Sequence, residues 1–454
     1  MRLNIGVRAA IASTMIAGAA HATNGYLTAG TGINSDGMAG AGSADPTDVM
    51  IMATNPAALA LVGQRLELGL ALFSPDRSYS TSPSLANGNG GAFTIGPNDI
   101  TSGDRLFPIP YIAMNWQLDP QDTLGAAFYG RGGMNTTWDG GTATFAPRPG
   151  FPPQTFPGTF GDGTAGVNLL QAFLNLSIAH SFADRQFSLG ASLIGAAQRF
   201  DARGVGTFAP YTYTFASSGG TVMPTSLTNN GADMSYGGGV AAGLEWRPNE
   251  VFTAAAAYTT KMYMSKLTRY SDLFAGHGGF DIPANATIGV TVKPSPGVAA
   301  SFDVQRIWYA DVASVGDPIS NLFACPTAGA GGTDLQSCLG GSHGAGFGWQ
   351  NMTVYKLGLR WQIDPDWTGR IGVSHGGQPI RSSEVLFNIL APGVVENHFA
   401  IGVTRRNGDR GEFSAAFTYV SNKSIQGVNT FDPTQTITLQ MHQYELEFGY
   451  AWIR

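Results

Sequence analysis

The sequence predicts an all-β protein, a transmembrane antiparallel β-barrel of about fourteen strands with an N-terminal hatch, or plug, inside its lumen. Only 12% of its 454 residues are charged, against roughly 25% in soluble domains. Several segments alternate apolar with polar or small residues, and the connections between them alternate between short and long. A soluble β-sandwich would also alternate, but the low charge and the loop asymmetry favour the barrel.

The first 22 residues have the three parts of a secretory signal peptide. Arg2 and Arg8 form a positive start, the apolar stretch AAIASTMIAGAA follows, and Ala20-His21-Ala22 fits a small-x-small cleavage site. An ordinary N-terminal helix is the alternative. We expect the mature chain to begin at Thr23 and to meet an oxidising compartment.

Residues 23–64 precede the first strand and predict the hatch. They are rich in Gly, Ala and Met and carry little charge, and Asn55-Pro56 interrupts any helix. A barrel of this size has an open aqueous centre unless something fills it. We therefore expect this segment to fold back into the lumen. A disordered periplasmic tail is the weaker alternative, because the segment is apolar.

The strands are expected in residues 65–454. RLELGLALF (65–73), GVAAGLEWR (239–247), YKLGLRWQI (355–363) and YELEFGYAW (444–452) each place large apolar residues on one face and polar or small residues on the other. No stretch after residue 22 is apolar for the ~20 residues of a spanning helix. A mature chain that enters the membrane must therefore do so as a closed barrel.

The connections fall into two classes. The short turns are expected at 118–122, 183–186, 247–250, 293–297, 363–367 and 406–409. The long connections are expected at 79–105, 139–165, 206–231, 266–281, 311–350, 378–394 and 423–434. Short turns on the periplasmic side and long extracellular loops are typical of outer-membrane barrels. With an even number of strands, both termini would lie on the periplasmic side.

The two cysteines, Cys325 and Cys338, flank a Gly-rich stretch of one long connection. In an exported protein this predicts a disulfide. Two thiols without a histidine cluster do not complete a tetrahedral site, so we expect no metal. A net charge of -6 argues against nucleic acid as a partner.

Three segments resemble the FadL/TodX family of outer-membrane transporters for long-chain fatty acids and other hydrophobic compounds. They are TNPAALALVG, RLELGLALFSPDRSYS and FDIPANATIGVTVKPSPGVAASFDVQRIWYADV. The most specific match is Asn55-Pro56-Ala57, which is similar to the NPA motif of the family's hatch. The resemblance covers essentially the whole mature chain.

The resemblance implies a path for ligand through the barrel: an external loop groove, an inner pocket, and a lateral opening at a kink in the third strand. That strand reads LGAAFYGRGGMNTTW, and its glycines suit a bulge. We place the opening at Gly130, Arg131, Gly132 and Gly133. The alternative is that these glycines only ease barrel curvature.

Two long loops carry the candidates for the ligand groove. Their apolar residues are Phe208, Tyr211, Tyr213, Phe215, Leu267, Tyr270, Leu273, Phe274 and Phe280. Within the second loop, the spacing of Leu267, Tyr270, Leu273 and Phe274 predicts one helical face. Exposed aromatic residues on outward loops would form a binding surface. The alternative is that they pack on each other or contact outer lipid.

The predicted function is passive transport of hydrophobic small molecules, with a porin for polar solutes as the rival. No nucleotide motif is present, and His180, His375, His398 and His442 lie in no catalytic motif, so we expect neither a cofactor nor an enzyme. Cationic partners for an acidic ligand could be Lys356, Arg360, Arg247, Arg370 and Arg131. The alternative is that they pair with Glu67, Glu245, Glu445 or Glu447 in the lumen.

The expected partners follow from this function. They are a hydrophobic small-molecule ligand, outer-membrane lipid and lipopolysaccharide, with the protein acting as a monomer. The expected location is the outer membrane of a Gram-negative cell.

Overall fold

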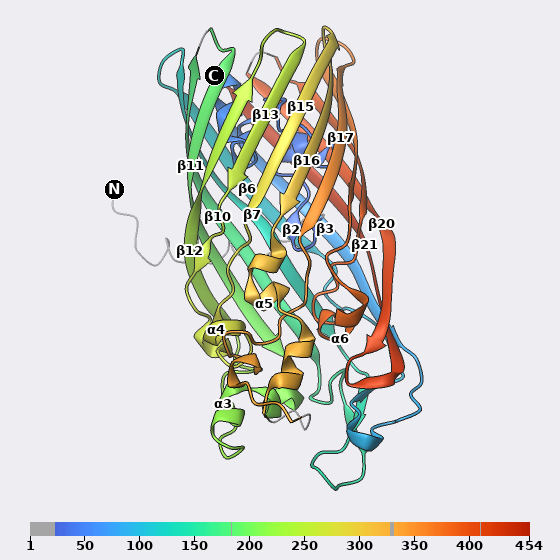
Figure 1. Ribbon diagram of the computed structural model, residues 1–454. Helices are drawn as coiled ribbons and strands as arrows, with labels where there is room; N and C mark the ends of the chain where they lie inside the picture. The colour runs from blue at the N-terminus through green and yellow to red at the C-terminus, as the bar shows by residue number, and fades with distance from the viewer. Residues whose placement is uncertain (1–22, 183, 327–330, 409) are drawn as a thin grey trace, which may run out of the picture.

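The structure is a computed structural model that describes residues 23–182, 184–326, 331–408 and 410–454. The predicted signal peptide at 1–22 lies outside the described residues. Within them, fourteen long strands form a closed antiparallel barrel (Figure 1). The barrel strands are β3 (Arg65–Thr81), β6 (Phe107–Gln117), β7 (Asp122–Trp138), β10 (Ala165–Phe182), β11 (Phe187–Arg203), β12 (Asp233–Trp246), β13 (Phe252–Thr259), β15 (Asn285–Ser295), β16 (Val298–Ile307), β17 (Met352–Gln362), β18 (Trp367–Gly376), β19 (Asn397–Arg406), β20 (Gly411–Asn429) and β21 (Asp432–Ile453).

Each barrel strand pairs with the next one along the chain, and β21 pairs with β3 to close the ring. The prediction of a closed antiparallel barrel is confirmed. On β3, Leu68 and Leu70 are each 40% exposed, whereas Glu67 and Ala71 are buried. Because successive side chains of a strand point to opposite faces, the leucines form part of an outward apolar belt.

The remaining elements are short and lie inside the barrel or in its long loops. Residues 23–62 form β1 (Thr23–Asn24), β2 (Leu27–Thr28), α2 (Ile33–Asp36), η1 (Val49–Ala53) and η2 (Pro56–Leu61). The loops contain η3 (Asn89–Gly91), β4 (Thr94–Ile95), β5 (Asp99–Thr101), β8 (Thr142–Phe145), β9 (Gln154–Pro157), η4 (Gly206–Tyr211), α3 (Tyr213–Ser217), β14 (Tyr263–Met264), η5 (Thr268–Tyr270), α4 (Ala275–Gly278), η6 (Tyr309–Asp311), α5 (Ala313–Gly316), η7 (Ile319–Ala324), η8 (Leu335–Ser337), η9 (Ser382–Glu384) and α6 (Val385–Asn388). Among the described residues, no helix is long and apolar enough to cross a membrane.

The loops differ at the two ends of the barrel, as predicted. Short turns lie at one end, and the long loops that carry α3, α4, α5 and α6 gather at the other (Figure 1). The predicted long connection at 423–434 is wrong, because β20 and β21 continue to a tight hairpin at 430–431. Its polar residues bond to one another there: the Asn429 side chain donates to the Gln435 side chain at 2.9 Å.

The buried apolar core fills the lumen and continues into the long loops. It joins Met50, Met52 and Leu59 of the N-terminal segment with Phe200 of the wall and Trp349 of a loop. A barrel of fourteen strands has an open centre unless something fills it. Here residues 23–62 fill it and supply part of the core. This arrangement places the candidate site between the N-terminal segment and the loops.

Candidate functional site

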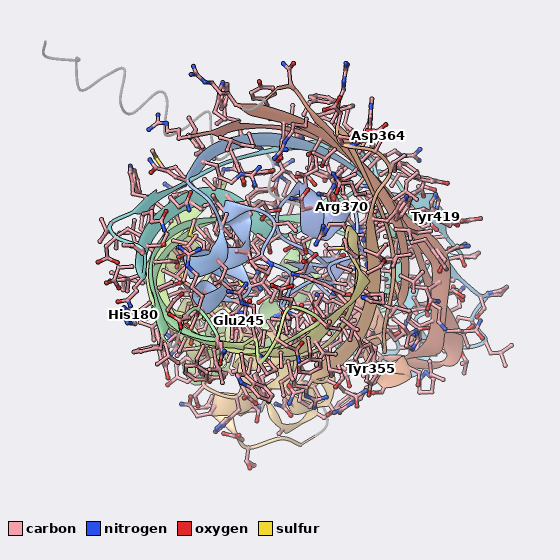
Figure 2. All side chains as sticks on the ribbon, turned by 90° about the horizontal axis from the view of Figure 1, so that it is seen from above. His180, Glu245, Tyr355, Asp364, Arg370 and Tyr419 are labelled. Atoms are coloured by element: carbon pink, nitrogen blue, oxygen red, sulfur yellow. A yellow bond between two sulfur atoms is a disulfide. The ribbon has the colours of Figure 1, made fainter. Side chains whose placement is uncertain are left out.

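Residues 23–62 lie inside the ring of strands, as the view along the barrel shows (Figure 2). Asn55, fully buried, is the N-cap of η2, and its Oδ1 accepts from the Ala57 N–H at 3.2 Å. Its Nδ2 donates to the Ser43 carbonyl at 3.2 Å and to Glu245 Oε2 of β12 at 3.4 Å. One side chain therefore caps a turn, ties two parts of the segment together and attaches it to the wall.

Two glycines of the wall face this motif. Gly190 of β11 and Gly243 of β12 are register partners. A Cβ atom at Gly190 would lie 2.3 Å from the Pro56 carbonyl carbon, and one at Gly243 would lie 2.2 Å from Asn55 Oδ1. Any side chain at either position would collide with Asn55-Pro56-Ala57. The motif therefore packs directly against the backbone of the two strands.

Charged residues of the wall hold the segment at further points. Arg360 of β17 forms a two-pronged ion pair with Asp45, with N–O distances of 2.7 and 2.8 Å. Asp303 of β16 accepts from the Gly42 N–H and the Ser43 N–H at 2.8 and 2.9 Å. These charge-assisted bonds are stronger than neutral ones, so the segment is fastened to several strands.

In the part of the chain that the structure describes, the lumen cations bond to groups other than the predicted strand glutamates. Lys356 Nζ donates to the Ala29 carbonyl at 2.6 Å, and Arg131 donates to the Ala53 carbonyl at 3.3 Å. Arg370 donates to Thr404 Oγ1 at 2.7 Å, and Arg247 donates to the Arg185 carbonyl at 2.9 Å. Lys356, Arg131 and Arg360 therefore bind the N-terminal segment, which the sequence pattern of the strands could not reveal.

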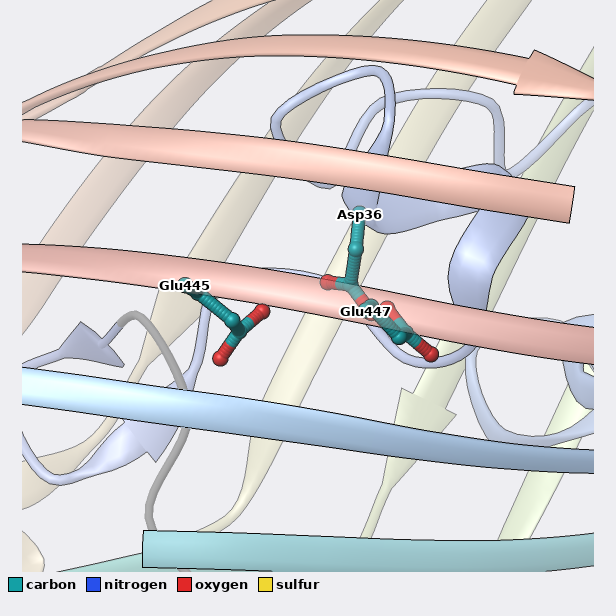
Figure 3. A group of neighbouring side chains, drawn as sticks. All are labelled: Asp36, Glu445 and Glu447. Carbon is teal, nitrogen blue, oxygen red and sulfur yellow. The ribbon is translucent and has the colours of Figure 1, made fainter. Parts of the chain in front are cut away.

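Three buried carboxyl groups form another contact between the segment and the wall (Figure 3). Asp36 of α2 faces Glu445 and Glu447 of β21, and their oxygen atoms lie within 4.8 Å of one another. Like charges at this distance repel unless other groups compensate them.

A β-bulge interrupts β7 at the predicted glycine run. Gly130 pairs with Ala172 of β10 and Gly132 pairs with Gln171, which leaves Arg131 without a partner residue on β10. Such an extra residue bends a strand and increases its twist.

The pairing of β7 with its other neighbour, β6, ends at the same place. The last register pair is Tyr111 with Tyr129. Beyond it, residues 107–110 of β6 pair with β3, and Pro108 and Pro110 have no N–H to offer to β7. The N-terminal segment takes over instead: Leu27 of β2 pairs with Gly132. The barrel wall is thus interrupted between β6 and the half of β7 that leads to the long loops, residues 130–138.

An apolar cavity lies beneath the long loops. We call it the outer cavity. It is lined by Val167, Phe200, Val205, Phe208, Leu227, Leu273, Phe274, Ser314, Leu339, Ala345, Gly346, Phe347, Phe387 and Leu390. Ser314 has the only polar side chain in that lining, so the cavity suits an uncharged, apolar molecule or part of one.

The prediction that the aromatic groove residues are exposed is wrong. Leu267, Tyr270 and Phe280 are fully buried, and the Phe274 ring lies 4.9 Å from that of Phe280 and 4.7 Å from that of Phe200. Packing of aromatic rings on one another has a lower free energy than their exposure to water. Of the nine candidates, Phe208, Leu273 and Phe274 line the outer cavity.

The other groove candidates lie elsewhere in the loops. Tyr211, Tyr213 and Phe215 are half-buried, in or beside η4 and α3. The predicted helical face from Leu267 to Phe274 is also wrong, since only the short turn η5 forms there. Burial raises the pKa of the Tyr211 and Tyr270 phenols, so both side chains are uncharged near neutral pH.

Most residues that line the outer cavity are not among the candidates from the sequence. Phe347, Phe387 and Leu390 come from the two loops that follow β16 and β18. No local pattern marks them, because they meet the other lining residues only through the fold. A disulfide joins Cys325 to Cys338 in the first of these loops, beside the lining residue Leu339.

A closed antiparallel barrel with an apolar outer belt and a filled lumen defines an integral protein of the bacterial outer membrane. The chain belongs to the family described as Outer membrane protein transport protein (OMPP1/FadL/TodX), whose model matches residues 9–449. No curated protein matches the chain.

Three solved structures illustrate the likeness of fold. A Pseudomonas aeruginosa FadL homologue is 16% identical with a TM-score of 0.63, and the match covers 94% of this chain and 99% of that one. The Pseudomonas putida toluene transporter TodX is 15% identical with a TM-score of 0.62 and the same coverage. The Ralstonia pickettii toluene transporter TbuX is 17% identical with a TM-score of 0.58, covering 94% of this chain and 98% of that one. At these identities the likeness establishes the fold.

Proposed function

We propose that this protein takes up hydrophobic small molecules passively across the outer membrane. The observation that carries the proposal is the outer cavity, which lies among the extracellular loops and is lined almost wholly by apolar side chains. The names of the structural relatives, two of which are toluene transporters, support the same class of cargo.

The physical basis is the affinity that such a cavity offers. Each Å² of apolar surface removed from water contributes roughly 25 cal/mol, whereas a water-filled pore offers an apolar solute no attraction. Transport would be driven by the concentration gradient of the cargo. Long-chain fatty acids and related hydrocarbons are the expected cargo.

In this proposal residues 23–64 are the hatch. The fastening of Asn55, Pro56 and Ala57 to glycines of the wall keeps the lumen closed to polar solutes. The cargo leaves sideways, where Gly130, Arg131, Gly132 and Gly133 interrupt the wall between β6 and β7. The hatch strand β2 covers this gap, so a small displacement of the hatch would open it.

The surroundings of the barrel follow from the same proposal. The outward apolar belt would contact outer-membrane lipid and lipopolysaccharide. One chain closes the barrel by itself, so a monomer would suffice. The protein would act as a transporter and not as an enzyme, with no cofactor or metal.

An uptake experiment tests the proposal. Cells that lack the protein would be compared with cells that express the wild type, using labelled toluene and labelled oleate. Leu273→Asp would place a charge in the outer cavity and should lower uptake at least about tenfold, because burying an unpaired carboxylate is costly. Leu85→Asp is the matched control, because Leu85 is 93% exposed in another loop.

Two outcomes would overturn the proposal. If neither compound responds to the wild-type protein while small polar solutes pass, the protein is a porin. If Leu273→Asp and Leu85→Asp transport equally well, the outer cavity is not on the path of the cargo.

A further inference from the structure

The short helix α2 of the N-terminal segment meets the wall at a group of buried acidic side chains. Asp36 of α2 is 5% exposed, and Glu445 and Glu447 of β21 are 2% and 1% exposed. One carboxylate oxygen from each residue lies within 4.8 Å of the other two (Figure 3). We call these three residues the acidic triad. Its side chains come from both the lumen segment and the wall, and they converge where the two meet.

Glu447 is the member of the triad without a partner. Neither of its carboxylate oxygens has a hydrogen-bond donor among the described residues. The charged side chains that act on it most strongly are other carboxylates, those of Asp36, Glu445 and Asp48. Asp36 and Glu445 also interact with further groups, and Lys356 attracts Asp36. A buried carboxylate without a donor is costly unless a ligand or a proton neutralises it.

The spacing and the chemistry of the triad fit a calcium ion. Ca²⁺ binds oxygen ligands at about 2.3–2.6 Å, so two oxygens on opposite sides of one ion lie about 4.6–5.2 Å apart. The oxygens of the triad are no further apart than that. Carboxylates bind Ca²⁺ through one or both oxygens in flexible geometry, whereas Mg²⁺ demands a near-ideal octahedron and keeps several waters. Ligands from one helix and one strand therefore favour Ca²⁺.

A small polar cavity lies beside the triad, toward the end of the barrel that carries the short turns. Its lining includes Asn34 of α2 and Gly449, which lies two residues beyond Glu447 on the same face of β21. The charged residues of this lining are three acids and one base: Asp48, Glu67, Glu412 and Arg65. This excess of negative charge attracts cations to the side of the triad that faces the barrel end.

We propose that the acidic triad binds a calcium ion that fastens α2 to β21. The ion would reinforce a weak attachment, because the Thr418 hydroxyl of β20 donates to the Asp36 carbonyl at 3.3 Å, beyond the usual O–H···O range of about 2.5–3.0 Å. The ion is structural and takes no part in the passage of cargo, so this inference does not rest on the proposed function. The expectation of no metal rested on the two cysteines, whereas these ligands come together only in the fold.

Calcium binding by the purified protein tests the site. The protein in phosphatidylcholine nanodiscs would be treated with EDTA, dialysed and titrated with CaCl₂ at pH 7 by calorimetry, with protein-free nanodiscs as the blank. We expect a single ion per chain, with a dissociation constant of about 10⁻³ M or lower, as in extracellular calcium modules. Glu447→Gln should weaken binding at least about tenfold, because even the loss of a group that only orients a ligand costs about 10- to 100-fold in metal affinity.

Hydrogen exchange in α2 gives an independent measurement. CaCl₂ should slow the exchange of residues 33–36 in the wild type, because an ion that binds only the docked segment stabilises it. In Glu447→Gln, which keeps the size of the side chain, CaCl₂ should leave this exchange unchanged. Glu250→Gln is the matched control for both measurements, since it removes the same charge at the exposed turn between β12 and β13, and it should behave as the wild type.

Three results would overturn the inference. If the wild type gives no more heat than protein-free nanodiscs, there is no calcium site, and this measurement needs no variant to fold; a proton shared by Asp36 and Glu447 would then neutralise the triad. Wild-type affinity in Glu447→Gln would place the ion elsewhere. Tighter binding of MgCl₂ than of CaCl₂ would overturn the choice of ion. The proposed function fails separately, if the wild type takes up neither toluene nor oleate.

Discussion

Replacement of Gly243 by alanine tests whether the N-terminal segment closes the lumen. The added Cβ would lie 2.2 Å from Asn55 Oδ1, 2.9 Å from Pro56 Cδ and 3.0 Å from the Ala57 nitrogen. Because ordinary contacts begin near 3.4 Å, the motif must move away from β12 by about an ångström. Alanine leaves the strand pairing with Gly190 intact, so the barrel wall should survive.

The size of the effect follows from the strain and the bonds at risk. Overpacking of a close contact costs about 1–3 kcal/mol, and the bond from Asn55 to Glu245 contributes about 1 kcal/mol. A shift of 1–3 kcal/mol raises the population of an open state about 5- to 150-fold. Gly243→Ala should therefore open the lumen far more often than the wild type does.

Single-channel conductance in planar bilayers measures this opening. Gly243→Ala and Gly190→Ala should show frequent openings to small ions, whereas the wild type should remain closed. Gly195→Ala on β11 is the matched control, because the nearest heavy atom to its added Cβ is the Leu174 carbonyl oxygen at 4.0 Å. If Gly243→Ala conducts no more than Gly195→Ala, then docking of Asn55-Pro56-Ala57 on the wall does not keep the lumen closed.

Three further predictions concern the fastening, the bulge and the loops. Asp45→Asn removes the charge of the buried partner of the partly buried Arg360 and should destabilise the packed N-terminal segment by about 1.5–3 kcal/mol, seen as faster hydrogen exchange in residues 23–62; unchanged exchange would contradict this. Deletion of Arg131 should restore the register of β7 with β10 and lower hydrophobic uptake, whereas Arg131→Ala keeps the bulge and should transport normally; equal uptake by both would refute a role for the bulge. Replacement of Cys325 and Cys338 by serine should destabilise their loop by about 2–4 kcal/mol and weaken toluene binding in the outer cavity, and chemical reduction of the wild type should have the same effect. If the serine variant and the reduced wild type both bind toluene as tightly as the oxidised wild type, the disulfide does not support the cavity.

The sequence by itself determined the barrel and most of its connections. Alternation with period 2, as in RLELGLALF, is set within a single strand and needs no distant contact to be seen. Six short turns were predicted at their observed places for the same reason, because turn residues act locally. The tip of the last hairpin was misread as a loop, since its polar residues are satisfied by partners such as the pair Asn429 and Gln435.

The tertiary structure alone decided the site. A loop sequence does not say whether Tyr270 or Phe280 is exposed, because burial depends on which other loops cover it. The partner of Arg360 is Asp45, 315 residues away in the chain, and no spacing rule connects them. Local periodicity therefore specifies the wall of this protein, whereas the cavities and their charges arise from contacts between segments far apart in sequence.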